Sequence, residues 1–355
     1  MKPGSRKPDA SFWRGKRVLV TGHTGFKGSW ACLWLHRMGA RVTGYAQAPW
    51  TQPNLFELAG VGACTDSQIG DLRDANTLQV TVHAAQPNIV LHLGAQSLVQ
   101  KGYASPLETF AVNTFGTAAV LDAVRLAGES DAVLIATTDK VYENNEDGHA
   151  FCEDDALGGH DPYSASKAAA EIVTRSYARS FPGRTQIATA RGGNVIGGGD
   201  FAPDRLVPDV WRAAEAGQQI QLRYPDATRP WQHVLDCLCG YLVFLEDLAQ
   251  RDKMPDALNF APDAADTLTV SAMVERLQYS LGARSGWKQM TGEFPKEMRV
   301  LKLSGERART TLGWSNLLTA GETIAWTTDW YKALAGGSDM RSITLSQIAS
   351  FMEIA

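Results

Sequence analysis

The chain has 355 residues, of which 44% are hydrophobic and 20% are charged, and its formal net charge is −4. This length allows one large domain plus a smaller one, and the mildly acidic balance without a basic cluster excludes a nucleic-acid-binding surface. The five cysteines and seven histidines show no paired metal-ligand spacing, so we expect reduced thiols and no metal site. The composition favours a small molecule as the partner.

Two features bear on localisation. Residues 1–12 carry basic side chains but no apolar run after them, so we expect a flexible tail and not a signal peptide. The most apolar helical stretch, around residues 237–245, is far shorter than the roughly 20 residues that a membrane span needs. The chain is therefore expected to be cytoplasmic, with no membrane partner.

A glycine-spaced turn follows the first apolar run, residues 18–21. Gly22 permits a tight turn, Gly25 lets backbone N–H groups approach a diphosphate, and Gly28 lets the next helix pack close to the strand. That helix, expected from about residue 29 to 38, would point its positive end at the diphosphate. We therefore expect a dinucleotide here, in contact with Gly22, Thr24, Gly25, Phe26, Lys27 and Gly28.

The adenosine end of such a dinucleotide is less clearly marked. The second strand, residues 41–46, usually ends in a carboxylate that holds the ribose, but residues 45–47 read Tyr-Ala-Gln. This loop does not distinguish NAD from NADP, although Lys27 is a candidate cation for a 2′-phosphate. Asp71, followed by Leu72, comes after the candidate third strand. It is a candidate acceptor for a hydrogen bond from the adenine amine and a candidate N-cap of the next helix, and the two roles are compatible.

The next strand, residues 88–93, is almost continuously apolar, as a strand buried on both faces requires. It runs into residues that would let a cofactor lie across the strand ends, namely Gly94, Ala95 and Gln96. In the long helix expected at 106–127, Asn113 stands among apolar positions and must be hydrogen-bonded. It would either brace the neighbouring strand or contact the cofactor.

Reactive side chains follow the strand predicted at residues 132–136, namely Thr138, Asp139 and Lys140. In open α/β sheets the chemistry takes place just beyond the carboxyl ends of the strands. Further along, Tyr163 and Lys167 are four residues apart in a predicted helix, so they lie on one helix face within reach of a common ligand. The candidate catalytic residues are therefore Thr138, Asp139 and Lys140 together with Tyr163 and Lys167.

Three consecutive glycines at residues 197–199 mark the exit from the nucleotide-binding part. Arginines beyond them are candidates for a substrate diphosphate, since a guanidinium pairs with phosphate in a bidentate manner. The residues expected to contact substrate are Asn194, Arg205, Leu206, Arg223, Arg229 and Arg299. The pattern predicts an α/β fold, a Rossmann-type doubly wound parallel sheet with a smaller mixed α/β C-terminal substrate domain. We expect residues 13–191 and 226–262 in the dinucleotide-binding domain, and 192–225 and 263–355 in the substrate-binding domain.

The glycine triad, the run of residues 138–140 and the Tyr163-x-x-x-Lys167 pair together resemble the extended short-chain dehydrogenase/reductase family of nucleotide-sugar enzymes, the NAD-dependent epimerases and dehydratases. Within that family, residues 193–200 and 229–234 are similar to the enzymes that act on CDP-glucose. Those enzymes carry Lys at the position of Lys140, where dTDP- and GDP-sugar dehydratases carry Glu.

The resemblance implies a 4,6-dehydratase that converts CDP-D-glucose into CDP-4-dehydro-6-deoxy-D-glucose and water, with a bound NAD that is reduced and reoxidised in each turnover. Tyr163 would take the proton of the C4 hydroxyl, its pKa lowered by Lys167, while Thr138 would orient the C4 oxygen. Asp139 would protonate the leaving C6 oxygen. Lys140 would be the base at C5, or would only position the substrate or stabilise enolate charge. The resemblance further implies deoxysugar synthesis for cell-surface polysaccharide such as lipopolysaccharide O-antigen, and a homodimer or homotetramer.

Two other functions remain to be weighed. A nucleotide-sugar C4 epimerase shares the fold, the cofactor and the Tyr163/Lys167 pair, but it needs no acid and base beside Thr138. Asp139 and Lys140 therefore favour a dehydratase. A non-catalytic dinucleotide-binding scaffold is disfavoured because the chain retains all of these reactive side chains together.

Overall fold

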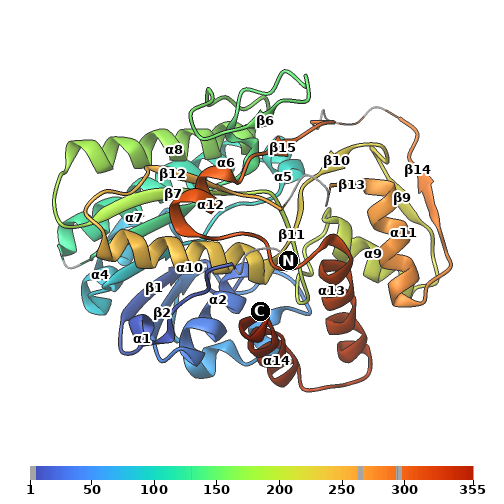
Figure 1. The fold of residues 1–355 in the computed structure, drawn as a ribbon, viewed down its shortest axis with the longest axis horizontal. Coiled ribbons are helices and arrows are strands. Elements are labelled where there is room, and N and C mark those ends of the chain that lie inside the picture. The colour runs from blue at the N-terminus through green and yellow to red at the C-terminus, as the bar shows by residue number, and fades with distance from the viewer. Residues whose placement is uncertain (1–4, 129, 263–266, 293, 295–297, 355) are drawn as a thin grey trace.

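A computed structural model describes residues 5–128, 130–262, 267–292, 294 and 298–354. Figure 1 shows a larger part, in which helices cover both faces of a central sheet, and a smaller part that carries α9, α11 and several short strands. The two parts meet at the carboxyl ends of the sheet strands.

The central sheet has seven parallel strands in the order β12-β7-β5-β4-β1-β2-β3. Their bounds are β1 Arg17–Thr21, β2 Arg41–Ala46, β3 Asp66–Ile69, β4 Ile89–His92, β5 Ala132–Ala136, β7 Gln186–Gly192 and β12 Ala257–Phe260. The chain runs outward from β1 to β3 and then returns to β4 on the other side of β1. Ligands of doubly wound sheets bind at such a reversal, beyond the carboxyl ends of the strands.

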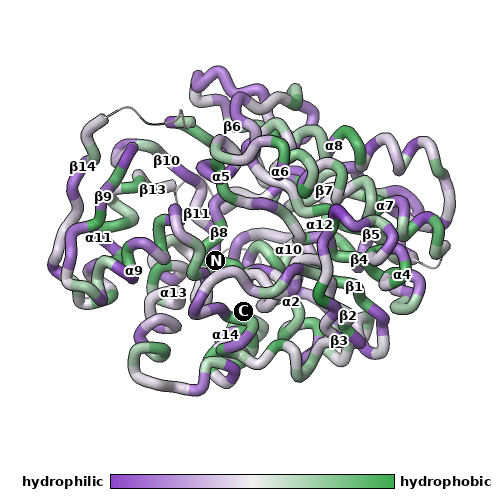
Figure 2. The backbone as a smooth tube through the Cα atoms, turned by 180° about the vertical axis from the view of Figure 1, so that it is seen from behind, coloured by the Kyte–Doolittle hydropathy of each residue, from purple (hydrophilic) through white to green (hydrophobic). Residues whose placement is uncertain are grey.

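Side-chain alternation along the strands builds a core on each face of the sheet. Val18 and Val20 of β1 face the core formed with α2 (Phe26–Arg37) and α10 (Val234–Gln250). Leu19 faces the opposite core, formed with α4 (Ala75–Ala85) and α7 (Gly116–Ala127), beside α8 (Pro162–Ser180). In Figure 2 the hydrophobic segments accordingly concentrate in the strands and their covering helices. The predicted fold class is confirmed.

Several predicted boundaries shift by a few residues. The helix predicted from about residue 29 is α2, and it begins at Phe26, because Gly25 already occupies its N-cap position. The helix predicted at 106–127 is present but contains a wide turn, with α6 (Pro106–Phe110), the π-helical η2 (Ala111–Phe115) and α7 following one another. Asn113 lies in that wide turn, which is a common place for functional residues.

The smaller part is built from α9 (Leu206–Glu215), α11 (Val270–Leu281) and α13 (Ala320–Ala335). It also holds the paired short strands β9 (Ile220–Leu222) with β14 (Trp287–Gln289), and β10 (Thr228–Arg229) with β13 (Leu268–Thr269). Helix α11 packs against both α9 and α13. Two elements of the C-terminal segment join the larger part instead: α12 (Glu306–Leu312) packs on β12, and α14 (Met340–Glu353) packs on α2.

The segment before β1 differs from the flexible tail expected at residues 1–12. Arg6 donates hydrogen bonds to Asp247 (2.7 Å) and Glu246 (3.1 Å) of α10, and Trp13 donates its indole N–H to Glu246 at 2.7 Å. Both carboxylates are almost fully buried and need such partners. Residues from Ser5 onward are therefore attached to α10, while residues 1–4 lie outside the described part.

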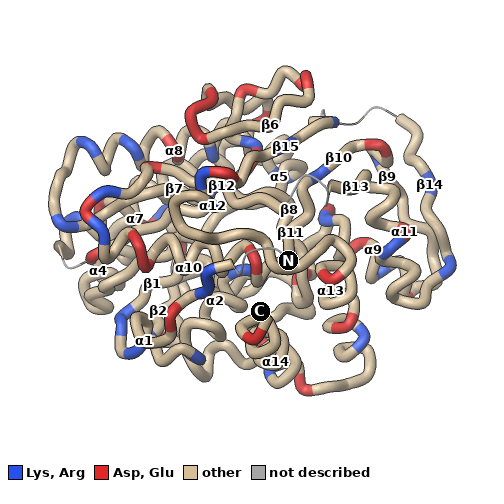
Figure 3. Tube along the Cα trace, in the orientation of Figure 1, with Lys and Arg blue, Asp and Glu red and all other residues tan. Residues whose placement is uncertain are grey.

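The surface shows a mixed distribution of charge. Lys and Arg side chains are scattered over both parts, whereas acidic residues gather on the loop that carries β6 (Ala150–Phe151), at the top of Figure 3. Within the described ranges, no helix combines the length and apolarity needed to cross a bilayer. Nor do three or more His, Cys, Asp or Glu side chains there form a cluster able to hold a metal ion.

Candidate active site

A cavity of about 520 Å³ opens where the carboxyl ends of the strands meet the smaller part. This is the size of a typical small-molecule site. Its walls come from the glycine turn after β1, the loops after β2, β3, β4 and β5, the start of α8, and the segment from β8 (Asn194–Ile196) through α9 to β10. The cavity therefore spans the point where the strand order reverses.

Two positions of the glycine turn, Gly22 and Gly28, leave no room for a side chain. Gly22 has a φ of +74°, and a Cβ there would lie 2.7 Å from the backbone nitrogen of Gly94. A Cβ on Gly28 would lie 2.1 Å from the carbonyl oxygen of Gly22. Gly25 is the N-cap of α2, so the free N–H groups of the first helical turn face the cavity beside Lys27. All six predicted turn residues line this wall.

Asp71 and Leu72 line the cavity as well. Asp71 accepts a hydrogen bond from the Gln47 side chain at 2.7 Å and pairs with Arg73. The hydrogen bond from Arg73 lowers the pKa of Asp71 to about 2, so the carboxylate is charged at neutral pH. The prediction that Asp71 caps the next helix is wrong, because Asp74 is the N-cap of α4.

Gly94 and Ala95 line the cavity, but Gln96 and Asn113 do not. The Asn113 carboxamide instead bonds both backbone groups of Gln96, at 2.8 Å and 2.9 Å, and donates to Ser166 at 2.9 Å. It therefore holds the loop after β4 against α8. This geometry matches the bracing alternative for Asn113, with a contact to the loop instead of to the strand itself.

The segment after β5 forms a short 3₁₀ turn, η3 (Asp139–Val141), capped by Thr138. The Asp139 Oδ1 atom accepts a hydrogen bond from the Thr138 hydroxyl at 3.0 Å and lies 3.2 Å from the Lys140 ammonium. Thr138 and Lys140 line the cavity, whereas Asp139 is fully buried beneath them. Its Oδ2 atom is buried and has no hydrogen-bond partner among the described residues.

Tyr163 and Lys167 come from the first two turns of α8, whose N-cap is Asp161. Both side chains are buried and both line the cavity. The Lys167 ammonium donates a hydrogen bond to the carbonyl oxygen of Ala136 at 2.8 Å, at the end of β5. Burial, and then the nearby charge of Lys27, lower the pKa of Lys167 to about 8.

The pKa of Tyr163 moves in the direction opposite to the one expected from the sequence. Burial raises it to about 12, although a hydrogen bond with Thr138 and the positive charge of Arg205 act to lower it. The spacing of Tyr163 and Lys167 could not indicate how completely the phenol is removed from water. Nor could it indicate that the ammonium bonds to a backbone carbonyl.

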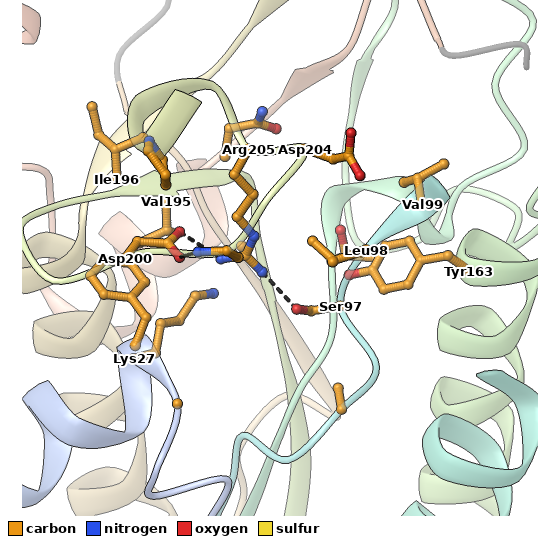
Figure 4. A pocket seen from close by; sticks show the side chains of 18 of the residues that line it. Lys27, Ser97, Leu98, Val99, Tyr163, Val195, Ile196, Asp200, Asp204 and Arg205 are labelled. Atoms are coloured by element: carbon orange, nitrogen blue, oxygen red, sulfur yellow. Dashed lines mark hydrogen bonds and ion pairs between the residues drawn. The ribbon is translucent and has the colours of Figure 1, made fainter. Parts of the chain in front are cut away.

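Arg205, the N-cap residue of α9, crosses the cavity (Figure 4). Its guanidinium bonds to Asp200 at 2.9 Å and to the Ser97 hydroxyl at 2.6 Å, and the figure places Lys27 beside it. It therefore joins the smaller part to the loop after β4. Ser97 is 108 residues away in sequence, and no motif indicated this contact.

The other predicted substrate residues divide into two groups. Asn194, Leu206, Arg223 and Arg229 line the cavity. The Arg299 side chain is exposed and does not line it, although the Arg299 carbonyl accepts a hydrogen bond from Arg229 at 3.3 Å. The structure adds wall residues that carried no sequence signal, namely Trp50, Gln100, Gln221, Tyr224 and Met298.

Comparison with known proteins gives a sequence family. The family model described as GDP-mannose 4,6-dehydratase matches residues 19–327. The chain belongs to the GDP-mannose 4,6-dehydratase family. Among curated members of this dehydratase family, CDP-glucose 4,6-dehydratase of Salmonella typhimurium is 41% identical over 97% of this chain and 98% of its own length.

Solved structures agree on the fold of this dehydratase family. The dTDP-glucose 4,6-dehydratase of Streptomyces venezuelae, solved with bound NAD, is 25% identical, with a TM-score of 0.79 over 91% of this chain and 99% of that one. An epimerase of Methanothermobacter thermautotrophicus superposes with a TM-score of 0.81 at 21% identity, covering 94% and 96% of the two chains. The fold alone therefore does not separate dehydratases from epimerases.

Proposed function

We propose that this chain is a CDP-glucose 4,6-dehydratase, which converts CDP-D-glucose into CDP-4-dehydro-6-deoxy-D-glucose and water. The observation that carries the proposal is the turn after β5, where Thr138 and Lys140 face the same cavity as Tyr163 and enclose the buried carboxylate of Asp139. An epimerase has no use for that acid and base pair. The relative that is 41% identical over nearly the whole chain supports CDP as the nucleotide.

The cavity wall fits a dinucleotide. The glycine turn leaves no room for side chains at Gly22 or Gly28 and presents the N-terminus of α2, which favours a diphosphate. When bound, NAD would accept a hydride from the sugar and later return it. The adenosine end would lie near Asp71 and Gln47, and the diphosphate near Lys27.

Tyr163 would take the proton of the C4 hydroxyl while Thr138 holds the C4 oxygen. A phenol with a pKa raised to about 12 is protonated at neutral pH, so its pKa must fall before it can act as a base. Arg205 already acts in that direction, and the Lys167 ammonium, which lines the same cavity, is a second cation able to favour the phenolate. Burial strengthens each of these electrostatic effects.

Asp139 and Lys140 would carry out the loss of water. A carboxyl group must be protonated to donate to the C6 oxygen, and an amine must be neutral to take the C5 proton. Because the Lys140 ammonium lies 3.2 Å from Asp139 Oδ1, transfer of one proton across that contact gives both forms at once. Lys140 could alternatively only position the sugar or stabilise enolate charge, as considered from the sequence.

The substrate diphosphate would lie against the smaller part. Arg223 and Arg229 line this side of the cavity, and a guanidinium is suited to bidentate pairing with phosphate oxygens. Asn194 lines it as well, and its Oδ1 atom is buried with no hydrogen-bond partner among the described residues. That oxygen is available to accept a hydrogen bond from a sugar hydroxyl.

We also propose that two copies of the chain pair through α6–α7 and α8. Large apolar side chains are exposed on these elements, namely Leu107 (86%), Phe115 (52%) and Ile172 (60%). Exposed apolar side chains gathered on neighbouring helices support an interaction site on this face. Light scattering tests the pairing of two copies: a dimer mass is expected, and a monomer would exclude it.

The five free cysteines support a reducing compartment, which would be the cytoplasm.

A panel of CDP-, dTDP-, GDP- and UDP-glucose, with products weighed by mass spectrometry, tests the assigned reaction. We expect CDP-glucose to be preferred and its product to be lighter by one water. A product of unchanged mass would identify an epimerase. Water loss mainly from another nucleotide sugar would overturn the choice of base, and cofactor binding without any turnover would favour the non-catalytic scaffold.

A further inference from the structure

A buried ion pair lies directly behind the catalytic turn. Arg191, at the end of β7, is fully buried and donates two parallel hydrogen bonds to Glu171 of α8, at 3.0 Å and 2.8 Å. A buried bidentate pair of this kind has a fixed geometry. Neither side chain lines the cavity, and the carboxylate and the guanidinium bind each other, so we assign the pair no contact with substrate or cofactor.

The ion pair makes hydrogen bonds to the residues at both ends of the segment that carries Thr138, Asp139 and Lys140. At the upstream end, Glu171 accepts a hydrogen bond from the Thr137 hydroxyl. At the downstream end, the remaining guanidinium nitrogen of Arg191, Nη1, donates to the Tyr142 hydroxyl at 2.8 Å, and the guanidinium carbon lies 5.0 Å from the centre of the Tyr142 ring. One rigid group thus fixes the residues on either side of the turn.

Tyr142 is held at several points. Its hydroxyl donates to the Asn259 side chain of β12 at 2.6 Å, and its ring stacks on Phe151 at 4.8 Å. Burial raises the pKa of Tyr142, against the opposing effect of Arg191, so the hydroxyl remains a donor throughout the neutral range. The side chain is fully buried and does not line the cavity.

We propose that Tyr142, held by Arg191, is a positioning residue that sets the place of Lys140 and Asp139 for the loss of water. The inference rests on the proposed function. Tyr142 is two residues after Lys140, so movement of its ring shifts the downstream half of the turn. The upstream half, with Thr138, remains tied to β7 because the Thr137 N–H donates to the carbonyl oxygen of Ala190 at 2.8 Å.

This division predicts a selective effect of Tyr142→Phe, which removes only the hydroxyl. Misplacement of a catalytic group by about 1 Å costs up to ~100-fold in rate, so we expect kcat for water loss to fall ~10- to 100-fold with KM nearly unchanged. Oxidation at C4 should persist, so the absorbance of reduced cofactor accumulates during a single turnover. Wild-type protein should show no such accumulation.

Ser130→Ala is the matched control. Ser130 lies just before the amino end of β5, whereas the catalytic turn follows the carboxyl end of that strand. Its side chain is buried and donates one hydrogen bond to the carbonyl oxygen of Pro87 at 2.8 Å. Ser130→Ala removes one buried hydrogen-bonded hydroxyl, as Tyr142→Phe does, but should leave kcat unchanged. An equal fall in both variants would overturn the proposal, as would wild-type kcat in Tyr142→Phe or parallel loss of oxidation and water loss.

A second readout does not depend on turnover. Lys140 is 19% exposed at its side chain, so its modification by acetic anhydride can be followed by mass spectrometry. We expect a severalfold change in that rate in Tyr142→Phe and none in Ser130→Ala. An unchanged rate in Tyr142→Phe would refute the positioning role even if CDP-glucose proved not to be the substrate. A wild-type protein without water-loss activity would instead contradict the proposed function.

Discussion

Replacing Lys167 with methionine should abolish turnover but stabilise the protein when no cofactor is added. Burial lowers the pKa of Lys167 from 10.5 to about 8, which corresponds to about 3 kcal/mol of unfavourable free energy at about 1.4 kcal/mol for each pKa unit. Methionine removes this cost and also the hydrogen bond to Ala136, worth roughly 1 kcal/mol. The expected gain in the free energy of unfolding at pH 7 is therefore about 2 kcal/mol.

The sign of this effect depends on pH. Between pH 8 and 10.5 the unfolded chain binds more protons at Lys167 than the folded chain does, so this group makes wild-type stability rise with pH. The gain in the free energy of unfolding from Lys167→Met should therefore shrink above pH 8 and become a loss near pH 10.5, where only the lost hydrogen bond remains.

Urea unfolding of both proteins at pH 7 and pH 10.5 measures this difference in stability. Exposed Lys253 supplies the control, since Lys253→Met should show no pH-dependent difference. A Lys167→Met protein that is less stable than wild type at pH 7, or a difference that does not change with pH, would refute the reasoning.

Three further substitutions test the site. Tyr163→Phe should abolish reduction of the cofactor by CDP-glucose, measured by absorbance, and near-wild-type turnover would remove Tyr163 from the role of base. Asp139→Asn should slow water loss by roughly 10²–10⁴-fold, the usual range for one general acid, while oxidation at C4 continues; unchanged formation of the dehydrated product would mean that another residue is the acid. Gly28→Ala places a Cβ 2.1 Å from the Gly22 carbonyl oxygen and should cost ~2 kcal/mol of stability and weaken NAD binding in calorimetry; wild-type affinity would show that the turn can relax without affecting the cofactor.

Sequence patterns located the elements whose signals are local. The apolar run of β5 and the glycine spacing after β1 predicted a buried strand and a tight turn, and both are present. Helical spacing placed Tyr163 and Lys167 on one face, and both line the cavity. Each of these signals depends on neighbours within a few residues, so a single sequence contains it in full.

The remaining features depend on contacts between distant residues. Arg6 is held by α10 some 240 residues later, and Arg205 by Ser97 from another part of the chain. Asp71 and Asp74 both precede α4, and only the backbone geometry decides that Asp74 is the cap. The raised pKa of Tyr163 results from burial by surrounding segments. Spacing contains no information on any of these.

The most direct test of the account uses CDP-glucose that carries deuterium at C4. If Tyr163, Asp139 and Lys140 act on one bound sugar, the hydride removed from C4 returns to C6 of the same sugar before the product leaves. We predict a product that is lighter by one water and carries deuterium in its C6 methyl group. Deuterium that remains at C4 in a product of unchanged total mass, or deuterium that is lost to solvent, would contradict the account.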